Sequence, residues 1–433
     1  MTYRALVVAD DLTGAMDSGH EFAARGFDTV VTLVEEQVDS DVLVVDTDSR
    51  SASASAAERA VEEAIDIYPA ALVYKKVDST LRGNPIAETD TAIAAAEADL
   101  ALVAPAFPVT GRTTVDGAHL VDGVPVTEAL DDAGTPPTSH LPTLLADSAY
   151  PVATCPIACV ERGSEAIRAS FPDVGEPVIV VPDASSEEHL DAIARAVAEN
   201  DRRVLFVGSA GLARHVRLPE IGSTNRQEGG GEATNGEPTD DGSSKPERTP
   251  TGGVLGIAGS AHPRTIEQLG ALSAERVIEL DVARAVTDPA TAATAASTPA
   301  IEALSDGQTA VVTSVPDREA IERAREAGAA AGVEDVGERL ERALATVAGE
   351  VYAEHTPEGL FLTGGAIAIG VLDELDATGV RPTGEAIERG VPVGAVLGGH
   401  AYGTATITKA GGFGTERTIA NCLACLRQGD QCS

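Results

Sequence analysis

The densest group of side chains that could bind or activate a small molecule lies at residues 75–84, in the sequence KKVDSTLRGN. Its two lysines stand side by side in a chain that holds only four, and an aspartate, two hydroxyls, an arginine and an asparagine follow them. Arginine can hold a carboxylate through two parallel hydrogen bonds. The segment therefore predicts a site for a substrate rich in carboxylate and hydroxyl groups; the alternative is a solvated loop with ordinary surface charges.

Two more polar segments follow apolar runs of strand length. Asp10 and Asp11 come directly after the run ALVVA, and Arg50 closes the segment DTDSR at residues 46–50. Side chains just past the carboxyl end of a parallel strand line the ligand crevice of an α/β sheet. The two carboxylates could there orient a substrate hydroxyl or accept its proton. The alternative is that they only cap a helix, for which Thr13 is another candidate cap.

Three glycine-containing turns in the second half of the chain suit a phosphate group. They are residues 259–262 (GSAH), 363–366 (TGGA) and 409–414 (KAGGFG), and Lys409 in the third is the last lysine of the chain. A glycine turn between a strand and a helix lets backbone N–H groups approach a phosphate closely. Together the turns favour a nucleotide site, while each alone is compatible with an ordinary tight turn.

Two other groups of residues are expected to be structural. Residues 117–126 (GAHLVDGVPV) predict a hairpin that turns at residues 122–123, and His119 within it is expected to support the fold rather than to react. The five cysteines are an odd and sparse set that does not suggest a disulfide scaffold. Cys422 and Cys425 lack a second ligand pair, so we expect two neighbours on a terminal helix rather than a metal site.

The elements that must position these segments alternate between strands and helices. This rhythm predicts an α/β fold with mainly parallel sheets. Apolar runs predict strands at residues 5–9, 29–33, 42–46, 71–76, 101–104, 178–181, 204–207, 254–258, 277–280, 310–315 and 359–363. Helices are predicted at residues 13–25, 51–67, 186–199, 264–274, 317–329 and 333–353.

Residues 221–252 interrupt this rhythm with a stretch that holds almost no apolar side chains. Such a segment cannot bury enough surface to offset its ordering entropy, which predicts a disordered acidic linker rich in glycine, serine and proline. A chain of 433 residues is also comfortable for two cores. We therefore expect one α/β domain at residues 1–220 and a second, separate one at residues 253–433.

The charge and hydropathy of the chain exclude some classes of protein. A net charge of −37 argues against nucleic-acid binding, which needs a basic face. An acidic surface almost without lysine is typical of a halophilic protein in a salt-loaded cytosol, where salt screens the self-repulsion. No apolar run reaches the roughly 18 residues of a membrane span, and the first residues lack the features of a signal peptide. We therefore expect a cytoplasmic protein that binds no membrane.

Several well-known catalytic motifs are missing from the sequence. It contains no G-x-x-x-x-G-K-[ST] motif of P-loop enzymes and neither the H-R-D nor the D-F-G motif of protein kinases. No H-E-x-x-H and no G-x-S-x-G occurs, and no G-x-G-x-x-G opens the first predicted helix. A nucleotide would thus have to be bound by some other arrangement of glycine turns.

Together these motifs resemble one family, the four-carbon acid sugar kinases, whose members include threonate, erythronate and 3-oxo-tetronate kinases. The resemblance spans nearly the whole chain apart from the predicted linker, and KKVDSTLRGN is its most specific part. The other matching stretches are residues 10–15, 46–50, 105–117, 259–265, 363–366 and 409–414. His262 and Ala410 stand where the family often has serine.

The resemblance implies that the first domain holds the sugar acid and the second holds ATP. It places substrate contacts at Asp10, Arg50, Ser79, Thr80, Leu81 and Arg82. It places ATP contacts at or beside Ser260, Thr363, Gly364, Gly365, Ala366, Gly411 and Gly412. The density of polar groups at residues 75–84 adds Lys76, Asp78 and Asn84 to the expected substrate contacts.

The expected reaction is transfer of the ATP γ-phosphoryl group to a terminal hydroxyl of a four-carbon sugar acid. Arg50 and Arg82 would fix the substrate carboxylate. Asp10 or Asp11 would orient the hydroxyl or act as its base. Lys409 and the glycine turns would hold the phosphates, and Mg²⁺ would bridge them with few protein ligands. Closure of the two domains would exclude water; the oligomeric state stays open, with a homo-oligomer among the possibilities.

Two other functions compete with this hypothesis. One is an NAD-dependent oxidoreductase acting on a similar hydroxy acid, against which the missing dinucleotide motif counts. The other is a ligand sensor that keeps the fold without catalysis. The complete polar set at residues 75–84 and the two apparent ligand-binding domains count against a sensor.

Overall fold

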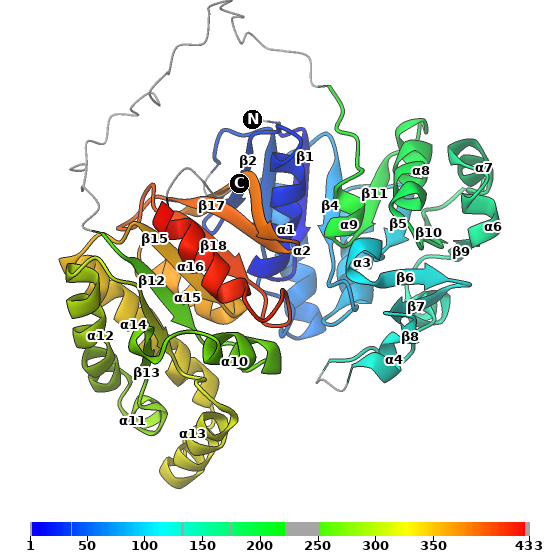
Figure 1. The fold of residues 1–433 in the computed structure, drawn as a ribbon. Coiled ribbons are helices and arrows are strands. Elements are labelled where there is room, and N and C mark those ends of the chain that lie inside the picture. Colours follow the sequence, from blue (N-terminus) through cyan, green and yellow to red (C-terminus); the bar gives the residue numbers. More distant parts are fainter. Residues whose placement is uncertain (1, 36, 131–133, 174, 221–251, 429–433) are drawn as a thin grey trace, which may run out of the picture.

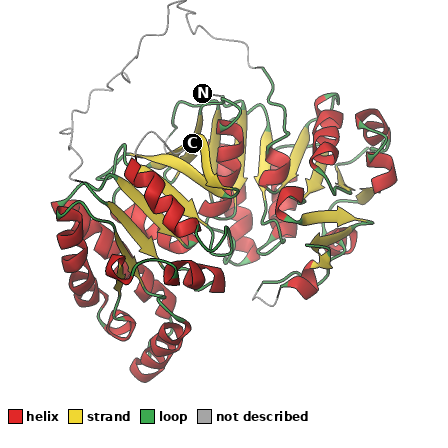
Figure 2. Ribbon diagram, in the orientation of Figure 1, coloured by secondary structure: helices red, strands yellow, loops and turns green. Residues whose placement is uncertain are grey.

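The strands of the protein form one long sheet that runs through both halves of the chain (Figure 1). The computed structural model describes residues 2–35, 37–130, 134–173, 175–220 and 252–428. Within these residues the main sheet has 15 strands, and a separate small sheet has three. Figure 2 shows helices packed along the strands of both halves.

The N-terminal half contributes eight strands of the main sheet, described here in their spatial order. They are β2 (Thr29–Thr32), β3 (Val42–Asp46), β1 (Ala5–Ala9), β4 (Val73–Lys76), β11 (Val204–Gly208), β5 (Leu100–Ala104), β10 (Val178–Pro182) and β9 (Val152–Cys155). All neighbours among them pair in parallel. Their carboxyl ends therefore share one edge, which collects the polar segments that follow them.

Helices bury both faces of this half because successive side chains of a strand point in opposite directions. Ala5, Val7 and Ala9 pack with one set of helices, while Leu6 and Val8 pack with another. The first set is α1 (Leu12–Ala23), α8 (Glu187–Ala198) and α9 (Ala210–Ala213), and the second is α2 (Ala54–Ile67) and α3 (Pro85–Ala95). Shorter helices lie between α3 and α8 in the chain: α4 (Val126–Ala129), α5 (Leu141–Leu144), α6 (Ile157–Val160) and α7 (Ser164–Ala169).

The C-terminal half adds seven strands, of which the last two in spatial order run antiparallel to their neighbours. In spatial order they are β13 (Val277–Glu279), β14 (Ala310–Thr313), β12 (Val254–Ala258), β15 (Gly359–Thr363), β18 (Ala405–Lys409), β17 (Val391–Leu397) and β16 (Gly379–Glu388). The helices are α10 (Pro263–Gly270), α11 (Val282–Thr287), α12 (Pro289–Ser305), α13 (Arg318–Ala331), α14 (Val336–Glu354), α15 (Gly365–Glu374) and α16 (Thr418–Gln428).

The two halves are joined edge to edge in one sheet, whereas the sequence predicted two separate units. β16 pairs antiparallel with β2, with Gly379 opposite Thr32 and Val380 opposite Val31. Helix α1 packs across this junction against β16, β17 and α15. Gly19 of α1 permits the close approach, because a Cβ there would lie 3.3 Å from Pro382 Cγ.

A small antiparallel sheet stands beside the N-terminal half and supports one loop of the site. Its strands are β6 (Arg112–Val115), β7 (Ala118–Val121) and β8 (Val124–Pro125). The predicted hairpin turn is confirmed by positive φ angles of 50° at Asp122 and 80° at Gly123. His119 Nε2 donates to the Ser79 carbonyl at 2.7 Å and Nδ1 lies 3.1 Å from Thr114 Oγ1, so this buried ring supports the Ser79 loop.

Most predicted strands and helices are present with shifted ends. The first helix begins at Leu12, and its N-cap is Asp11 rather than Thr13, with Asp11 Oδ1 accepting from the Gly14 amide at 2.8 Å. Cys422 and Cys425 are both buried on α16, as expected. The predicted linker at residues 221–252 lies, except for its last residue, outside the described residues. No helix of the described chain is long and apolar enough to cross a membrane.

Candidate active site

A polar pocket lies where the carboxyl ends of β1 and β4 meet a turn from the C-terminal half. Its wall includes residues from the helix that follows β1, from the loop that follows β4 and from the turn that follows β18. The lining residues are Asp11, Thr13, Gly14, Asp17, Arg50, Lys76, Asp78, Ser79, Arg82, Phe107, Ser209, Ala210, Ala410 and Phe413. Five of the nine predicted substrate contacts are among them: Arg50, Lys76, Asp78, Ser79 and Arg82.

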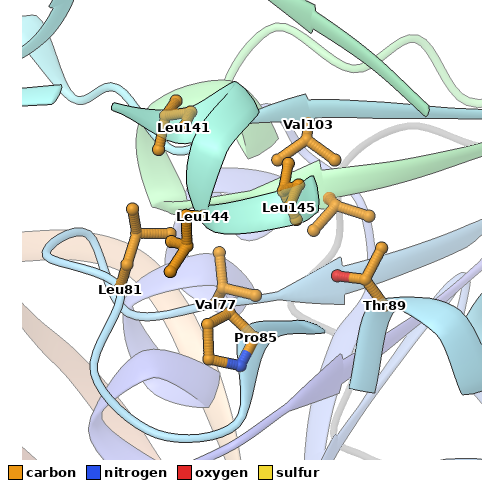
Figure 3. A pocket seen from close by; sticks show the side chains of 9 residues that line it. Val77, Leu81, Pro85, Thr89, Val103, Leu141, Leu144 and Leu145 are labelled. Atoms are coloured by element: carbon orange, nitrogen blue, oxygen red, sulfur yellow. The ribbon is translucent and has the colours of Figure 1, made fainter. Parts of the chain in front are cut away.

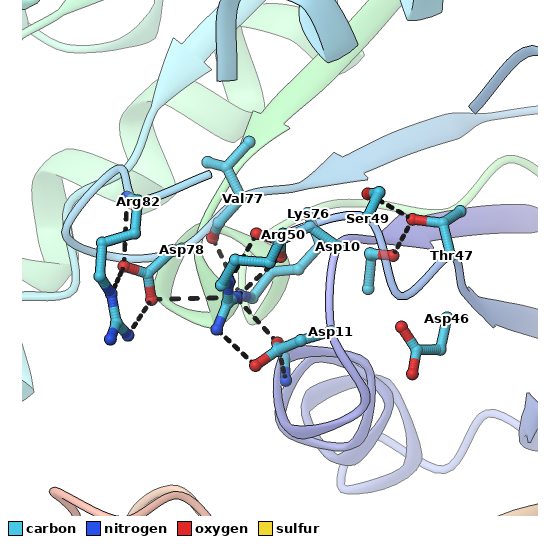
Figure 4. Close-up of polar contacts among 12 residues, drawn as sticks. Asp10, Asp11, Asp46, Thr47, Ser49, Arg50, Lys76, Val77, Asp78 and Arg82 are labelled. Atoms are coloured by element: carbon cyan, nitrogen blue, oxygen red, sulfur yellow. Dashed lines mark hydrogen bonds and ion pairs between the residues drawn. The ribbon is translucent and has the colours of Figure 1, made fainter. Parts of the chain in front are cut away.

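Arg50 is the centre of an ion-pair network at this edge of the sheet (Figure 4). Its Nε and Nη2 donate to the two oxygens of Asp10, each at 2.8 Å. Nη2 also donates to Asp11 Oδ1 at 2.8 Å, and Nη1 donates to Asp11 Oδ2. A substrate carboxylate at Arg50 would thus have to share donors that already serve two aspartates.

The network shifts the pKa values of Asp10 and Asp11 in opposite directions. Burial raises the pKa of Asp10, but the charges of Arg50, Lys75 and Lys76 outweigh it, so the net pKa is lowered. For Asp11, burial and the neighbouring Asp10 charge prevail over Arg50, and the net pKa is raised. Asp10 is also almost fully buried and does not line the pocket. Its geometry fits the positioning of Arg50 better than proton transfer.

The loop after β4 is organised by Asp78. Arg82 Nε donates to Asp78 Oδ2 at 2.8 Å and Nη2 donates to Oδ1 at 3.1 Å, while the Thr80 hydroxyl donates to Oδ2. Burial alone would raise the pKa of Asp78, but Arg50 and Arg82 hold it far below its usual range. Asp78 is therefore an anion that aims Arg82, whose half-exposed guanidinium lines the pocket.

Three predicted substrate contacts in this loop have other partners in the structure. The Thr80 hydroxyl is occupied by Asp78, and the Asn84 amide donates to the carbonyls of Ser49 and Ala52 at 3.1 and 3.0 Å. Leu81, with a φ of 63°, turns its side chain into an apolar pocket beneath the loop (Figure 3). A contact between the substrate and the side chains of Thr80, Leu81 and Asn84 remains a prediction, and this geometry does not favour it.

The two adjacent lysines point to opposite faces of the sheet. Lys75 forms a buried ion pair with Glu88 of α3, at 3.2 Å between Nζ and Oε2. Lys76 is buried on the pocket side, where its Nζ donates to the Val77 carbonyl at 2.9 Å. No carboxylate of the described residues forms an ion pair with Lys76. A buried cation of this kind favours an anionic ligand.

The three glycine turns of the C-terminal half meet at the carboxyl ends of β12, β15 and β18, which are neighbours in the sheet. The Gly259 amide donates to the Thr363 carbonyl at 3.1 Å, and a Cβ on Gly364 would lie 3.3 Å from the Ser260 amide nitrogen. Gly364 has a φ of 106°, which favours glycine. The structure thus brings the predicted ATP contacts together.

The amino end of α15 faces the N-terminal half. A Cβ on Gly365 would lie 3.8 Å from Thr13 Oγ1 and 4.0 Å from Asp11 Oδ2. Helix amino ends favour anions. A phosphate held at the glycine turns would therefore lie close to Asp11 and Thr13, which follow β1.

The ammonium group of Lys409 does not point to where a lysine that binds phosphate would be expected to point. Its buried Nζ donates to the carbonyls of Ala410, Gly411 and Phe413, at 2.8, 3.1 and 3.3 Å. Burial lowers the pKa of Lys409 to about 8. In this geometry the ammonium shapes the glycine turn from behind, and a direct phosphate contact stays a prediction.

Asp17 is a pocket residue that the sequence analysis missed. It lies on α1 one turn beyond Thr13, and both side chains line the pocket. The available signal was a carboxylate four residues after Thr13, and thus on the same face of the helix that follows the first strand. Burial raises the pKa of Asp17 to about 7.

Comparison with known proteins agrees with this division of the molecule. Residues 5–216 match a family model described as a sugar-binding N-terminal domain, and residues 255–419 match one described as a nucleotide-binding C-terminal domain. The fold and site thus define a two-domain α/β protein in which a sugar-binding half and a nucleotide-binding half share one sheet.

Similar proteins of known name narrow the class of this protein to one family of kinases. The chain is 35% identical to the D-threonate kinase of Salmonella typhimurium, over 97% of both chains. It is 32% identical to the 3-oxo-tetronate kinase of Methylobacterium radiotolerans, over 89% of this chain and 91% of the relative, and 29% identical to the D-erythronate kinase of Heliobacterium modesticaldum, over 96% of both. The chain belongs to the four-carbon acid sugar kinase family and is a phosphotransferase.

A solved structure shows the same fold. A crystal structure of a protein from Salmonella typhimurium LT2 superposes with a TM-score of 0.75 over 99% of both chains, at 22% sequence identity. The arrangement of the two halves along one sheet is therefore shared with an experimentally determined protein.

Proposed function

We propose that the protein transfers the γ-phosphoryl group of ATP to a terminal hydroxyl of a four-carbon sugar acid such as threonate, erythronate or a 3-oxo-tetronate. The observation that carries the proposal is the meeting of the two halves at one pocket. Arg50, Lys76 and Arg82 enter this pocket from the N-terminal half, and Ala410 and Phe413 enter it from the turn after β18. Both reactants can thus be held side by side.

The two halves have different tasks in this proposal. Residues 1–220 bind the acid, and residues 253–433 bind ATP at the turns that contain Ser260, Gly364 and Gly411. Lys76 and Arg82 are the pocket cations best placed for the carboxylate, because Arg50 already serves Asp10 and Asp11. Arg50 instead fixes the two aspartates beside the transferred group.

Catalysis in phosphoryl transfer consists mostly of positioning and charge stabilisation. The amino end of α15, the glycine turns and the pocket cations supply positive potential where charge develops. Among the described residues no cluster of three or more potential metal ligands occurs. Mg²⁺, which keeps several waters and binds phosphates readily, would therefore be held chiefly by ATP, with Asp11 the carboxylate that lies beside Gly365 at the amino end of α15.

A coupled ATP-consumption assay tests the proposal. The full chain is assayed in molar KCl with Mg²⁺ against threonate, erythronate and 3-oxo-tetronate isomers. We expect turnover with one of these acids and none with the corresponding acid that lacks the terminal hydroxyl. ATP binding without turnover on any of the acids would contradict the proposal.

Replacement of Lys76 by methionine is expected to raise the KM for the acid at least about tenfold, because a bound carboxylate loses its buried cation. Lys75→Met is the matched control. It leaves Glu88 buried and unpaired and is expected to lower the free energy of unfolding by about 3–5 kcal/mol with little change in KM. Steady-state kinetics and urea unfolding separate the two effects. A KM effect confined to Lys75→Met would contradict the assignment.

A further inference from the structure

Asp17 is the pocket carboxylate that no ion pair or hydrogen bond of the described residues engages. Asp11 is bonded to Arg50 and to the Gly14 amide, and Asp78 is bonded to Arg82 and Thr80. Asp17 is 9% exposed and lies on the face of α1 that lines the pocket. Its oxygens are thus available to a ligand.

The surroundings of Asp17 come from several elements. Lys76 of β4 and Arg214, which follows α9, favour its ionised form, while Glu21 on α1 and Asp11 before α1 oppose it. Tyr74 of β4 also lies nearby; burial raises its pKa, and the Asp17 charge adds to this effect. Arg214 is itself bound by Glu21, at 2.8 Å between Nε and Oε2. Lys76 is therefore the pocket cation whose charge acts on Asp17.

A base for a sugar hydroxyl must be within the pocket, free to accept and able to ionise near the working pH. Asp10 fails the first two conditions, since it lies outside the pocket and both of its carboxylate oxygens accept hydrogen bonds from Arg50. Asp11 lines the pocket, but its oxygens accept hydrogen bonds from Arg50 and Gly14. Burial raises the pKa of Asp17 to about 7, which suits a proton acceptor at neutral pH.

We propose that Asp17 is the catalytic base of the phosphoryl transfer, a role that rests on the function proposed above. The O–H bond of the acid's terminal hydroxyl breaks, and its proton passes to the Asp17 carboxylate. The hydroxyl oxygen forms a bond to the γ-phosphorus as the bond from that phosphorus to the bridging oxygen breaks, and ADP leaves with the electron pair. Asp17 returns its proton to water when the products leave.

The test is the pH dependence of kcat/KM for the acid in the full-length wild type and in Asp17→Asn. Asp17 accepts a proton only when ionised, so wild-type kcat/KM is expected to fall about tenfold per pH unit below the Asp17 pKa of about 7. Asp17→Asn is expected to lose about 100-fold or more in kcat, to keep its KM within about threefold, and to lose this acidic limb.

A stability measurement shows whether the variant is folded. Because burial raises the pKa of Asp17, its ionised form destabilises the folded chain progressively as the pH rises above the ordinary value of 3.8. The neutral asparagine is therefore expected to melt at or above the wild-type temperature at a pH of about 8. A loss of activity in a variant that melts normally then reports on chemistry.

Asp46→Asn is the matched control. Burial also raises the pKa of Asp46, to about 8, but its side chain does not line the pocket. This variant is expected to retain the acidic limb. If Asp17→Asn keeps the acidic limb of the kcat/KM profile, or if only Asp46→Asn loses it, the role of Asp17 is overturned while the kinase function stands. Absence of wild-type turnover with every acid overturns both proposals together.

Discussion

Replacement of Arg50 by methionine is expected to lower the free energy of unfolding by about 3–5 kcal/mol at neutral pH and to abolish turnover. Arg50 is bonded to both oxygens of Asp10 and to both of Asp11. Its removal leaves two adjacent carboxylates, of which Asp10 is fully buried, without the cation that is hydrogen-bonded to both of them. It also releases Asp11 from its position beside the amino end of α15, so stability and activity fall together.

The pH dependence of this loss follows from the acidity of Asp10. The pKa of Asp10 is lowered in the folded chain, because the nearby cations outweigh its burial. The stabilisation from the ion pair is therefore present above the unfolded value of about 4 and is lost as the pH falls through the lowered folded pKa. Urea unfolding at several pH values should show the deficit of Arg50→Met shrinking in acid.

Arg203→Met is the control for this prediction. Arg203 also pairs with a carboxylate, Glu97, but both side chains are mostly exposed, at 62% and 74%. Solvent-exposed pairs contribute little, so we expect a change within about 0.5 kcal/mol and full activity. Equal destabilisation by the two replacements would contradict the central role of the Arg50 network.

Gly411→Ala is expected to raise the KM for ATP at least about tenfold while leaving the KM for the acid nearly unchanged. A Cβ at Gly411 would lie 2.8 Å from His262 Cβ and even closer to Ser260 Oγ. Real Cβ atoms do not approach so closely, so the turn must move. The Gly411 carbonyl accepts from Lys409 and from Thr265 Oγ1, which ties this movement to the whole turn.

Gly337→Ala provides the comparison within the same half of the chain. Gly337 lies in the first turn of α14, and a Cβ there meets nothing within 4 Å. Alanine in a helix is favoured over glycine by about 0.5–1 kcal/mol, so this variant should unfold at slightly higher urea with unchanged KM for ATP. An unchanged KM for ATP in Gly411→Ala would remove this turn from the nucleotide site.

The parallel core of the fold was predictable because its strands are continuous apolar runs. β1, β3, β12 and β15 have the predicted bounds, since both faces are buried throughout β1, β12 and β15 and over the first three residues of β3. The strand β16 was not predicted, because Pro382, Gly384 and Glu385 interrupt any apolar pattern. Its pairing with β2 joins residues far apart in sequence, which no local pattern encodes.

The site was predictable at the level of segments and less so at the level of side chains. Motif density placed the segments that contain Asp10, Arg50 and Lys76 at one edge of the sheet. It could not show that Lys75 turns away to Glu88 or that Lys409 faces the carbonyls of its own turn, because these choices depend on strand pleat and burial. Asp17 escaped notice since one acidic residue in a helix usually lies on the surface.

The shared sheet allows the chain to be divided between its two halves without separating them. The β16–β2 pairing and the packing of α1 against β16, β17 and α15 hold the halves together without the peptide connection at residues 221–251. Longer connections raise the entropy of loop closure only slowly. The segment between the halves is thus free to vary in length among related proteins, and two co-expressed fragments ending at residue 220 and starting at residue 252 should assemble into one working enzyme.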